Sequence, residues 1–426
     1  PFRSITEDLE PEYITVTPDG NTAFVALQEN NTLAKINLTT LAVELLPLGT
    51  KDHSQPGNEI DASDDDGDTF NLQNYPVMGL FMPDAIASFS SGGTDYVITA
   101  NEGDARDEDE DIRNVTLDPT AFPDAATLQL TPNAGNLEIS TIEGDTDGDT
   151  DFDELFTYGA RSFSIFDSDG NLVFDSGSAL AQIANGAGIY PDDRSDNKGT
   201  EPEGVTTGVV GTRNFAFVGL ERASAILAYD ITTPASPAFQ QIVFDQPNDI
   251  SPEGLTFVSA AESPSGVPLL IVTNEVSNTL AVYSVAIPNQ PDITFNQKGR
   301  GGPIVGEDLY TASGAGQSLR LRAKKRSVFK FNVGNDGSAT ATYAVRGFKL
   351  PRKRFKLRFL QTSPARSNVT ASVRTGREAE TIGAGATASY QAIISKTTSR
   401  PARISEKVSA TGGALTDLMT YRASFR

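Results

Sequence analysis

Acidic residues recur at a fixed place in four short β-rich segments of the chain. Each segment begins with a proline and an acid, continues through two apolar runs separated by a turn, and ends on a glutamate. The acid and the glutamate stand 17, 18, 18 and 22 residues apart, which is the length of a β-hairpin. The four pairs are Glu12 with Glu29, Asp84 with Glu102, Glu203 with Glu221, and Glu253 with Glu275.

Clustered carboxylates of this kind are typical of a site for a hard divalent cation. The two ends of a hairpin lie together, so the acid that opens each copy and the glutamate that closes it are expected at one end. Like charges raise one another's pKa unless a counter-ion is present, and Ca²⁺ prefers oxygen ligands. We therefore expect Ca²⁺ at a shared acidic mouth, with ligands drawn from Glu12, Asp84, Glu102, Glu203, Glu221, Glu253 and Glu275.

The segment 145–154 is a second candidate calcium site. Aspartates stand at every second position, so that a tight loop could surround one ion from several sides. Gly148 is at the fourth rather than the sixth position and Phe156 is at the twelfth, so the segment is not an EF-hand. A solvated acidic turn is the alternative. The expected ligands are Asp145, Asp147, Asp149, Asp151 and Asp153.

Blades of a β-propeller are the elements that would position these acids. Self-similar β units of about 40 to 50 residues are typical of propellers, whose four-stranded blades surround a channel. The third unit predicts strands at 204–209, 214–220, 225–231 and 239–244. We expect an all-β protein in which residues 1–287 form an acidic propeller domain with at least four blades.

Two insertions interrupt the regular pattern, at about 49–80 and 104–157. The first is too polar and turn-rich at 48–58 and 61–68 for a strand. The second begins in an acidic run and ends before strands resume at 160–166 and 172–175. Both are expected to leave the propeller, the first as a long excursion of loops without strands.

The remainder of the chain predicts a different domain. Residues 288–297 contain two prolines and read as an extended linker. Residues 298–426 show alternating apolar residues and predict an immunoglobulin-like β-sandwich of about seven strands. The strands are expected at 328–333, 339–345, 355–360, 369–373, 386–394, 403–410 and 419–425.

Charge divides along the same boundary. The whole chain has a net charge of −22, but residues 298–426 hold 24 Lys and Arg against 7 Asp and Glu, or +17, which leaves −39 for residues 1–297. Independent solubility of two domains is one interpretation. The other is that the basic domain docks on an anionic cell-surface polymer or polysaccharide, or on the acidic domain of a neighbouring copy in head-to-tail assembly.

A row of basic residues supports docking of the basic domain on an anionic partner. Cations alternate with apolar residues at 352–360, so one face of that strand would be basic and the other buried. Nucleic acid is disfavoured as the partner because the phenylalanines have the buried parity. The expected anionic-partner residues are Arg320, Arg322, Lys324, Lys325, Arg326, Arg352, Arg354, Lys356 and Arg358.

Composition excludes several kinds of site. The chain has no Cys, one His and no apolar run near 18 residues, which excludes disulfides, Cys or His zinc clusters and a membrane-spanning segment within it. The single imidazole, His53, lies in a polar loop and is interpreted as a hydrogen-bonding residue. No catalytic residue is assigned.

Ordered motifs from about residue 8 to 286 resemble the choice-of-anchor I family. They are Leu9–Ile14, Leu46–Ser54, Met82–Ala87, Thr99–Asp107, Tyr158–Ile165, Glu201–Val205, Gly219–Arg222 and Asn274–Ser277. The family includes mesenchyme-specific cell-surface glycoproteins and bacterial proteins labelled alkaline phosphatase. The resemblance implies a secreted or surface-attached propeller. Family members usually carry about three further blades before the first motif, so we expect those blades on a separate chain or removed from this one.

Two functions are compatible with these features. The first is a calcium-binding structural, adhesive or matrix-assembly role outside the cell. The alternative is a calcium-dependent phosphoesterase at the acidic mouth, with charge stabilisation from Lys51, Arg106, Arg161 or Arg222. A zinc alkaline phosphatase site is excluded because one His cannot build it.

Overall fold

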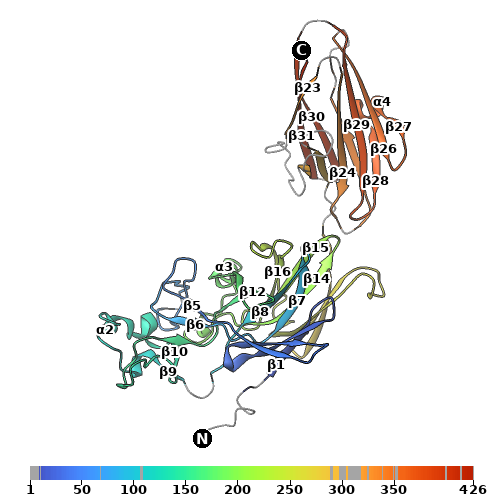
Figure 1. Cartoon of the computed structure of the whole chain (residues 1–426). Coiled ribbons are helices and arrows are strands. Elements are labelled where there is room, and N and C mark those ends of the chain that lie inside the picture. Colours follow the sequence, from blue (N-terminus) through green and yellow to red (C-terminus); the bar gives the residue numbers. More distant parts are fainter. Residues whose placement is uncertain are drawn as a thin grey trace. The chain divides into compact units, whose positions relative to one another are not determined.

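The computed structural model describes residues 9, 11–67, 69–105, 109–287, 291–296, 304–305, 318–323, 326–337, 339–348, 350, 354–398, 401–412 and 415–425; at 291–293, 295–296, 304–305, 318–323, 415 and 421 it describes the backbone alone. The chain divides into two compact units, which Figure 1 shows coloured along the sequence. Unit 1 comprises residues 1–209 and 213–284, and unit 2 comprises residues 285–426 and 210–212.

Four antiparallel sheets of unit 1 are propeller blades, as the repeats predicted. In each of them the strands lie side by side in chain order, and in the second, β7-β8-β12-β13, the strands of an insertion fall between β8 and β12 along the chain. The first blade is β1 (Pro11–Val16), β2 (Thr22–Leu27), β3 (Thr32–Asn37) and β4 (Val43–Pro47). The second is β7 (Ile86–Ser91), β8 (Thr94–Asn101), β12 (Ser162–Asp167) and β13 (Leu172–Asp175). The third is β14 (Pro202–Val210), β15 (Arg213–Leu220), β16 (Ala225–Asp230) and β17 (Ala238–Val243), and the fourth is β18 (Pro252–Val258), β19 (Leu269–Asn274) and β20 (Thr279–Ser284).

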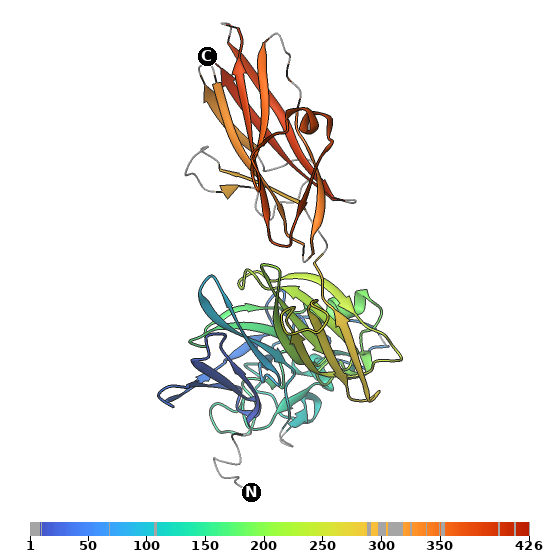
Figure 2. The same ribbon diagram turned by 90° about the vertical axis from the view of Figure 1, so that its right-hand side faces the viewer.

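The blades follow one another in chain order (Figure 2). β1 packs against β7 between the first two blades, and β15 packs against β18 between the last two. Thr15 Oγ1 lies 3.1 Å from Ser88 Oγ between the first two blades, and the Ala85 amide donates to the Glu203 carbonyl oxygen at 3.3 Å between the next two. Gly204 lies so near the fourth blade that an added Cβ would stand 2.2 Å from the carbonyl oxygen of Glu253. A side chain at position 204 would therefore separate the two strands.

The backbone repeats as the sequence does. Met82, Glu201 and Ser251 each precede the proline that opens a blade, and their φ angles are 44°, 51° and 60°. Side chains other than glycine rarely adopt this left-handed region because of steric clash. The same uncommon turn therefore introduces three of the blades and sets the direction of their first strands.

The insertions form a subdomain with its own sheet and core, which corrects the expectation of loops. The sheet contains a strand inside the segment judged too polar, because the Lys51 side chain is buried against Asp175, 2.9 Å away. Its strands, in sheet order, are β5 (Thr50–Asp52), β6 (Met78–Leu80), β11 (Phe156–Thr157), β10 (Glu138–Ser140) and β9 (Asp109–Asp111). The core includes Ile60, Val77, Ile112, Leu137 and Ile139.

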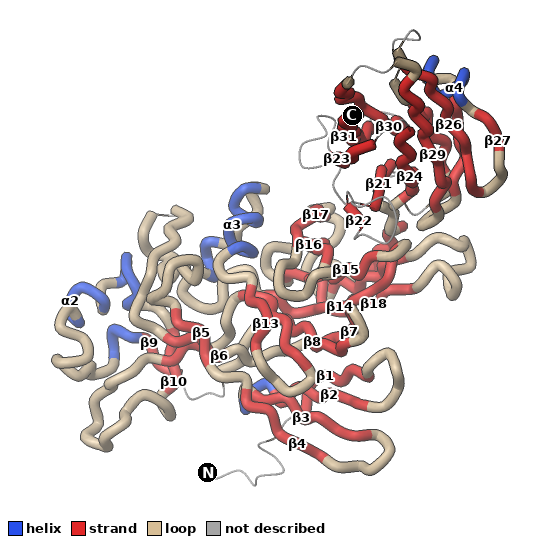
Figure 3. The backbone as a smooth tube through the Cα atoms, turned by 45° about the horizontal axis from the view of Figure 1, so that its top comes forward, coloured by secondary structure: helices blue, strands red, loops and turns tan. Residues whose placement is uncertain are grey.

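Helical segments are short and few among the described residues (Figure 3). In unit 1 they are α2 (Ala125–Leu128), α3 (Ala179–Gly186), the 3-10 turns Gln28–Asn30, Ile112–Asn114 and Asp192–Arg194, and a distorted turn at Thr131–Gly135.

Unit 2 is a β-sandwich, as predicted. One sheet is β22 (Ile304–Val305), β21 (Pro291–Asn296), β24 (Arg326–Asn335), β29 (Thr387–Lys396), β26 (Phe355–Ser363) and β27 (Ser367–Asn368). The other is β23 (Ser318–Ala323), β31 (Leu415–Phe425), β30 (Ala402–Gly412), β25 (Ala341–Arg346) and β28 (Glu378–Ile382). Both sheets contribute to a single core, with Phe329, Phe359 and Tyr390 from the first and Tyr343 and Val408 from the second.

Two sequence expectations for unit 2 were wrong. Residues 291–296, expected in a linker, form β21 and pair with β24, because Pro291 is the first residue of the strand, where no backbone donor is required. The expected strand at 369–373 is largely the helix α4 (Thr370–Thr375), which ends at Gly376 with φ 70°. Glycine adopts this C-terminal conformation without steric cost.

The first blade has one uncovered apolar face. Register places two cross-strand rows on it: Ile14, Val25, Ala34 and Leu45 in one, and Val16, Ala23, Ile36 and Val43 in the other. All eight side chains are apolar. Ile14, Val43 and Leu45 are 60%, 61% and 57% exposed, so no described residue covers this part of the face.

Candidate metal centre

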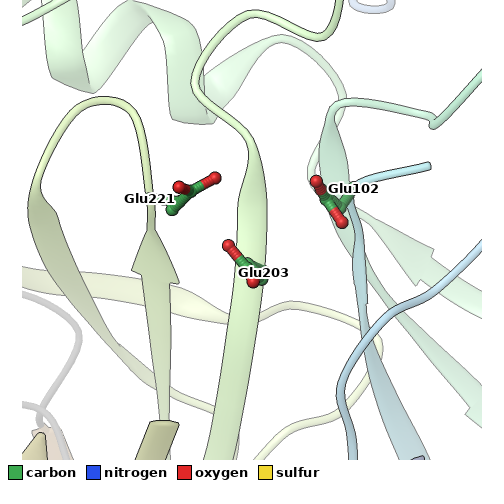
Figure 4. Close-up of side chains that lie close together, drawn as sticks. All are labelled: Glu102, Glu203 and Glu221. Atoms are coloured by element: carbon green, nitrogen blue, oxygen red, sulfur yellow. The ribbon is translucent and has the colours of Figure 1, made fainter. Parts of the chain in front are cut away.

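Three glutamates meet where the second and third blades adjoin. Glu102 directly follows β8, Glu203 is the second residue of β14, and Glu221 directly follows β15. One carboxylate oxygen of each lies within 4.8 Å of the others, and Figure 4 shows the three side chains around a common space. Three of the seven acids expected at the acidic mouth therefore come together.

Burial and mutual repulsion disfavour the ionised form of the carboxyl groups in this cluster. Burial, with the Glu102, Glu221 and Asp84 carboxylates, raises the pKa of Glu203 to about 9. Burial, with the charges of Glu102, Glu12 and Glu253, raises the pKa of Asp84 to about 7. Burial also raises the pKa of Glu102 and of Glu221, although Lys198 and Arg222 oppose the shifts.

Glu201, which sequence reasoning missed, organises the cations beside the cluster. Its side chain is fully buried and accepts from Arg194 Nε at 2.8 Å and Arg222 Nε at 3.3 Å, and Lys198 Nζ lies 3.7 Å away. Lys198 also pairs with Glu102, and Arg222 with Glu221. The only feature of the sequence that marks Glu201 is its position directly before Pro202. The period of the repeats does not show that a residue at a left-handed turn is buried.

The balance of charged side chains at the glutamate cluster favours the binding of one divalent cation or of two protons. Five carboxylates, those of Glu102, Glu203, Glu221, Glu201 and Asp84, share the region with three cations. Full ionisation would leave an excess of two negative charges. Protons on Glu203 and Asp84, whose pKa values are strongly raised, or one divalent cation, would remove that excess.

The donor set fits calcium. All three close ligands are carboxylates, and neither sulfur nor imidazole nitrogen accompanies them, which is the preference of a hard cation. Oxygen Oε2 of Glu203 is buried and accepts no hydrogen bond within the described chain. An unshared buried acceptor is costly unless a proton or cation contacts it.

The other predicted acids lie outside the trio. Glu12 and Glu253 are exposed and act on Asp84 only through their charge. Glu275 is exposed although it follows β19 as Glu221 follows β15. In the first blade the equivalent residue is Gln28, which follows β2, rather than Glu29.

A common turn supports this equivalence with Gln28. The carbonyl oxygens of Gln28, Glu221 and Glu275 each accept from the amide three residues further on, at 2.8 to 3.1 Å. Gln28 Nε2 lies 3.4 Å from Glu102 Oε2. Spacing did not identify this residue, because Glu12 and Gln28 are 16 residues apart, against 18 for the corresponding pairs of the next two copies.

The aspartate loop forms two overlapping trios. Asp145, Asp147 and Asp153 form one, and Asp151 and Asp153 join Asp118 in the other. Partial desolvation and the neighbouring Asp149 raise the pKa of Asp151 to about 6, and Asp149 raises the pKa of Asp147. Sequence reasoning missed Asp118, which lies outside the alternating run and reaches the loop only through the folded insertion.

His53 and two candidate phosphate-binding cations are structural. Burial and the charge of Lys51 lower the pKa of His53 to about 3, and its Nδ1 lies 2.7 Å from the Asn58 carbonyl oxygen, so the neutral ring donates from Nδ1. Lys51 forms an ion pair with Asp175 and donates hydrogen bonds to two backbone carbonyl oxygens. Arg161 Nη1 donates to the carbonyl oxygens of Asp61 and Ser195 at 2.7 Å, and Arg106 lies outside the described residues.

The basic residues of unit 2 belong to two different sheets. Lys356 and Arg358 are exposed on β26, on the face opposite the buried Phe355 and Phe359. Through β29, the register aligns Lys356 with Arg326 of β24 across Ser395, and exposed Lys330 is on the same face. The other predicted residues are placed as follows: Arg354 is exposed before β26, the backbones of Arg320 and Arg322 are in β23 of the other sheet, and Lys324, Lys325 and Arg352 lie outside the described residues.

Comparisons with known proteins identify a family and two relatives. The family model of the Choice-of-anchor I domain matches residues 2–234. Gigasin-3a of Magallana gigas is 28% identical over 185 residues, which cover 35% of this chain and 64% of that protein. The mesenchyme-specific cell surface glycoprotein of Strongylocentrotus purpuratus is 26% identical over 300 residues, which cover 58% of this chain and 38% of that protein. The chain thus matches less than two thirds of either relative's length.

Solved structures share only a distant likeness. The β-propeller domain of Myceliophteria thermophila Cps50 (Swd1) is 11% identical, with 66% of this chain and 83% of that chain covered and a TM-score of 0.21. Within the described residues, no helix has both the length and the apolar character needed to cross a membrane.

Proposed function

Because the chain belongs to the choice-of-anchor I family, whose domain model matches residues 2–234, we propose that unit 1 is a calcium-binding propeller of a secreted or cell-surface protein. Its role is structural, adhesive or in extracellular assembly. Similarity to a cell surface glycoprotein supports the location.

The Glu102, Glu203 and Glu221 cluster carries the calcium proposal. A cation there would contact carboxylates from two blades, and it would offset their repulsion where the blades adjoin. Equilibrium binding of Ca²⁺ to the purified chain tests it directly. Glu203→Gln is expected to remove this site, whereas sites at the aspartate loop would remain.

Phosphoester hydrolysis is less well supported. Arg222 is 42% exposed at the cluster and could contact an anion. Lys51 and Arg161, however, are buried in structural bonds. The arrangement thus favours a held cation over a site for phosphate.

The exposed cations of β24 and β26 are the proposed contact of unit 2 with an anionic surface polymer. Lys356→Ser with Arg358→Ser is expected to weaken binding to heparin beads by about tenfold at 0.15 M salt, because each exposed ionic contact contributes up to about 1 kcal/mol. Elution at rising salt measures the change, since screening weakens such contacts.

Arg403→Ser with Arg422→Ser is the matched control, because it removes two exposed cations from the other sheet. An equal loss in both double variants would contradict a specific face. Large species in light scattering of the chain at low salt, absent at high salt, would instead support head-to-tail contact between the acidic and basic units.

The uncovered face of the first blade is the proposed contact for further propeller blades. Its two aliphatic cross-strand rows give it the apolar surface that a further blade would need to stack on it. Ile14→Lys with Leu45→Lys is expected to reduce binding of a hydrophobic dye about twofold without lowering the melting temperature, because both side chains are exposed. Leu172→Lys is the single-site control, and unchanged dye binding in the double variant would contradict an open face.

A further inference from the structure

A cavity of about 570 Å³ lies in the inserted subdomain. It lies between the loop at 71–76 and the segment 121–133 that contains α2. Its volume is within the range of about 300 to 1,000 Å³ that is usual for small-molecule sites. None of its lining residues belongs to the glutamate cluster or to either aspartate trio. It is therefore separate from the candidate metal sites.

Two asparagines of the lining present acceptors, because their amide donors are already used. Asn74 Nδ2 donates to the carbonyl oxygens of His53 and Gln55 at 2.9 and 2.7 Å. Asn133 Nδ2 donates to the carbonyl oxygen of Thr127 at 2.7 Å. These contacts fix the amide orientation, since a flipped side chain would place two carbonyl oxygens together. No hydrogen bond among the described residues reaches the Oδ1 atom of either side chain.

A glutamine and an aspartate extend the acceptor set. Gln73 Nε2 donates to Asn71 Oδ1 at 2.8 Å, and no described residue donates to Gln73 Oε1. The carboxylate of Asp124 is exposed and makes no hydrogen bond or ion pair within the described chain. The polar lining therefore suits a ligand with several donors, at least one of them cationic.

The remaining lining is apolar. Tyr75, Ala125 and Leu128 are partly buried and pack against a core that includes Phe122, which also lines the cavity. A ligand that fits both surfaces needs an apolar face and a set of polar donors. A pyranose ring has this division, with C–H groups on its faces and hydroxyl groups around its edge.

The geometry points to this cavity as the binding site for an amino sugar. The ring rests on the apolar lining beside Tyr75, its hydroxyl groups donate to Gln73, Asn74 and Asn133, and its ammonium group pairs with Asp124. The charge of −39 on residues 1–297 also favours a cationic sugar over an anionic one. The inference rests on this cavity and is independent of calcium at the glutamate cluster.

Calorimetric titration of the full chain with a linear glucosamine tetramer at 0.15 M salt tests the inference. The fully N-acetylated tetramer has the same ring and linkage without the ammonium group, and it is expected to bind at least fivefold more weakly. Gln73→Ala and Asp124→Asn are each expected to weaken binding of the glucosamine tetramer about fivefold. Both side chains are exposed, so folding should be preserved.

Asp193→Asn is the matched control, because it removes one exposed negative charge of unit 1 away from the cavity. An equal loss of affinity in this variant and in Asp124→Asn would show general attraction to an acidic protein and overturn the site. Absence of tetramer binding at millimolar concentration would also overturn it. Equal affinity for the acetylated tetramer would contradict the contact between the ammonium group and Asp124.

Discussion

Millimolar Ca²⁺ is expected to raise the melting temperature of unit 1 by about 5 °C, and chelation is expected to reverse the change. A ligand that binds only the folded state adds about 2.7 kcal/mol at a hundredfold excess over Kd, and 1 kcal/mol shifts a domain of this size by about 2 °C or more. Glu203→Gln is expected to abolish most of the shift, because Glu203 is the central carboxylate of the trio. Differential scanning calorimetry with calcium and with chelator measures it.

Glu275→Gln is the matched control for this substitution. Glu275 occupies the place in the fourth blade that Glu221 occupies in the third, but it is exposed and outside the trio. Its calcium response should equal that of the unsubstituted chain. Asp147→Asn distinguishes the contribution of the aspartate loop to the calcium response from that of the glutamate cluster. Identical melting temperatures with calcium and with chelator in the unsubstituted chain would rule out both sites.

The repeats predicted which end of each hairpin carries acids, because strand length and turn position are local properties. They did not predict which acids meet. Glu275 is equivalent in sequence to Glu221 but remains exposed, because the cluster forms only where the second and third blades adjoin. Lys198 joins it through Glu102, 96 residues earlier in the chain, and Glu201 through Arg222, 21 residues later, and neither contact is encoded in the spacing of the repeats.

The insertions show the same division between local and non-local information. Their polar composition correctly indicated an excursion from the propeller, but it hid a sheet whose core residues are scattered between Ile60 and Leu155. Asp118 joins Asp151 and Asp153 only after that subdomain has folded. In unit 2, the two prolines of 288–297 suggested a linker, although a strand such as β21 tolerates proline at its first position.

The affinity of the glutamate cluster for Ca²⁺ is expected to rise about a hundredfold between pH 6 and pH 8. The pKa of Glu203 is raised to about 9, so at neutral pH the metal-free cluster keeps a proton that calcium must displace. Below that pKa, each displaced proton makes the apparent affinity rise about tenfold per pH unit. Asp84, whose pKa is raised to about 7, strengthens the dependence below neutrality.

Stability of the metal-free chain should change in the opposite direction over the same range. A carboxyl group with a raised pKa in the folded state contributes stability that is present below its unfolded pKa, near 4.5, and lost as pH rises through its folded pKa of about 9. The chain in chelator should therefore become less stable from pH 5 to pH 9, while saturating calcium offsets the loss. Glu203→Gln, which has no proton to lose, should flatten both dependences.

Calorimetry in buffers of different ionisation enthalpy counts the protons that calcium releases. The charge excess of two at the cluster predicts between one and two protons per ion near pH 7, falling by about one in Glu203→Gln if a weaker site persists. A calcium affinity equal at pH 6 and pH 8, with no proton release, would mean that the ion binds already ionised carboxylates. Binding would then be assigned to the trio of Asp145, Asp147 and Asp153, which does not include Asp151 and in which Asp153 has a lowered pKa because it accepts hydrogen bonds from Thr146.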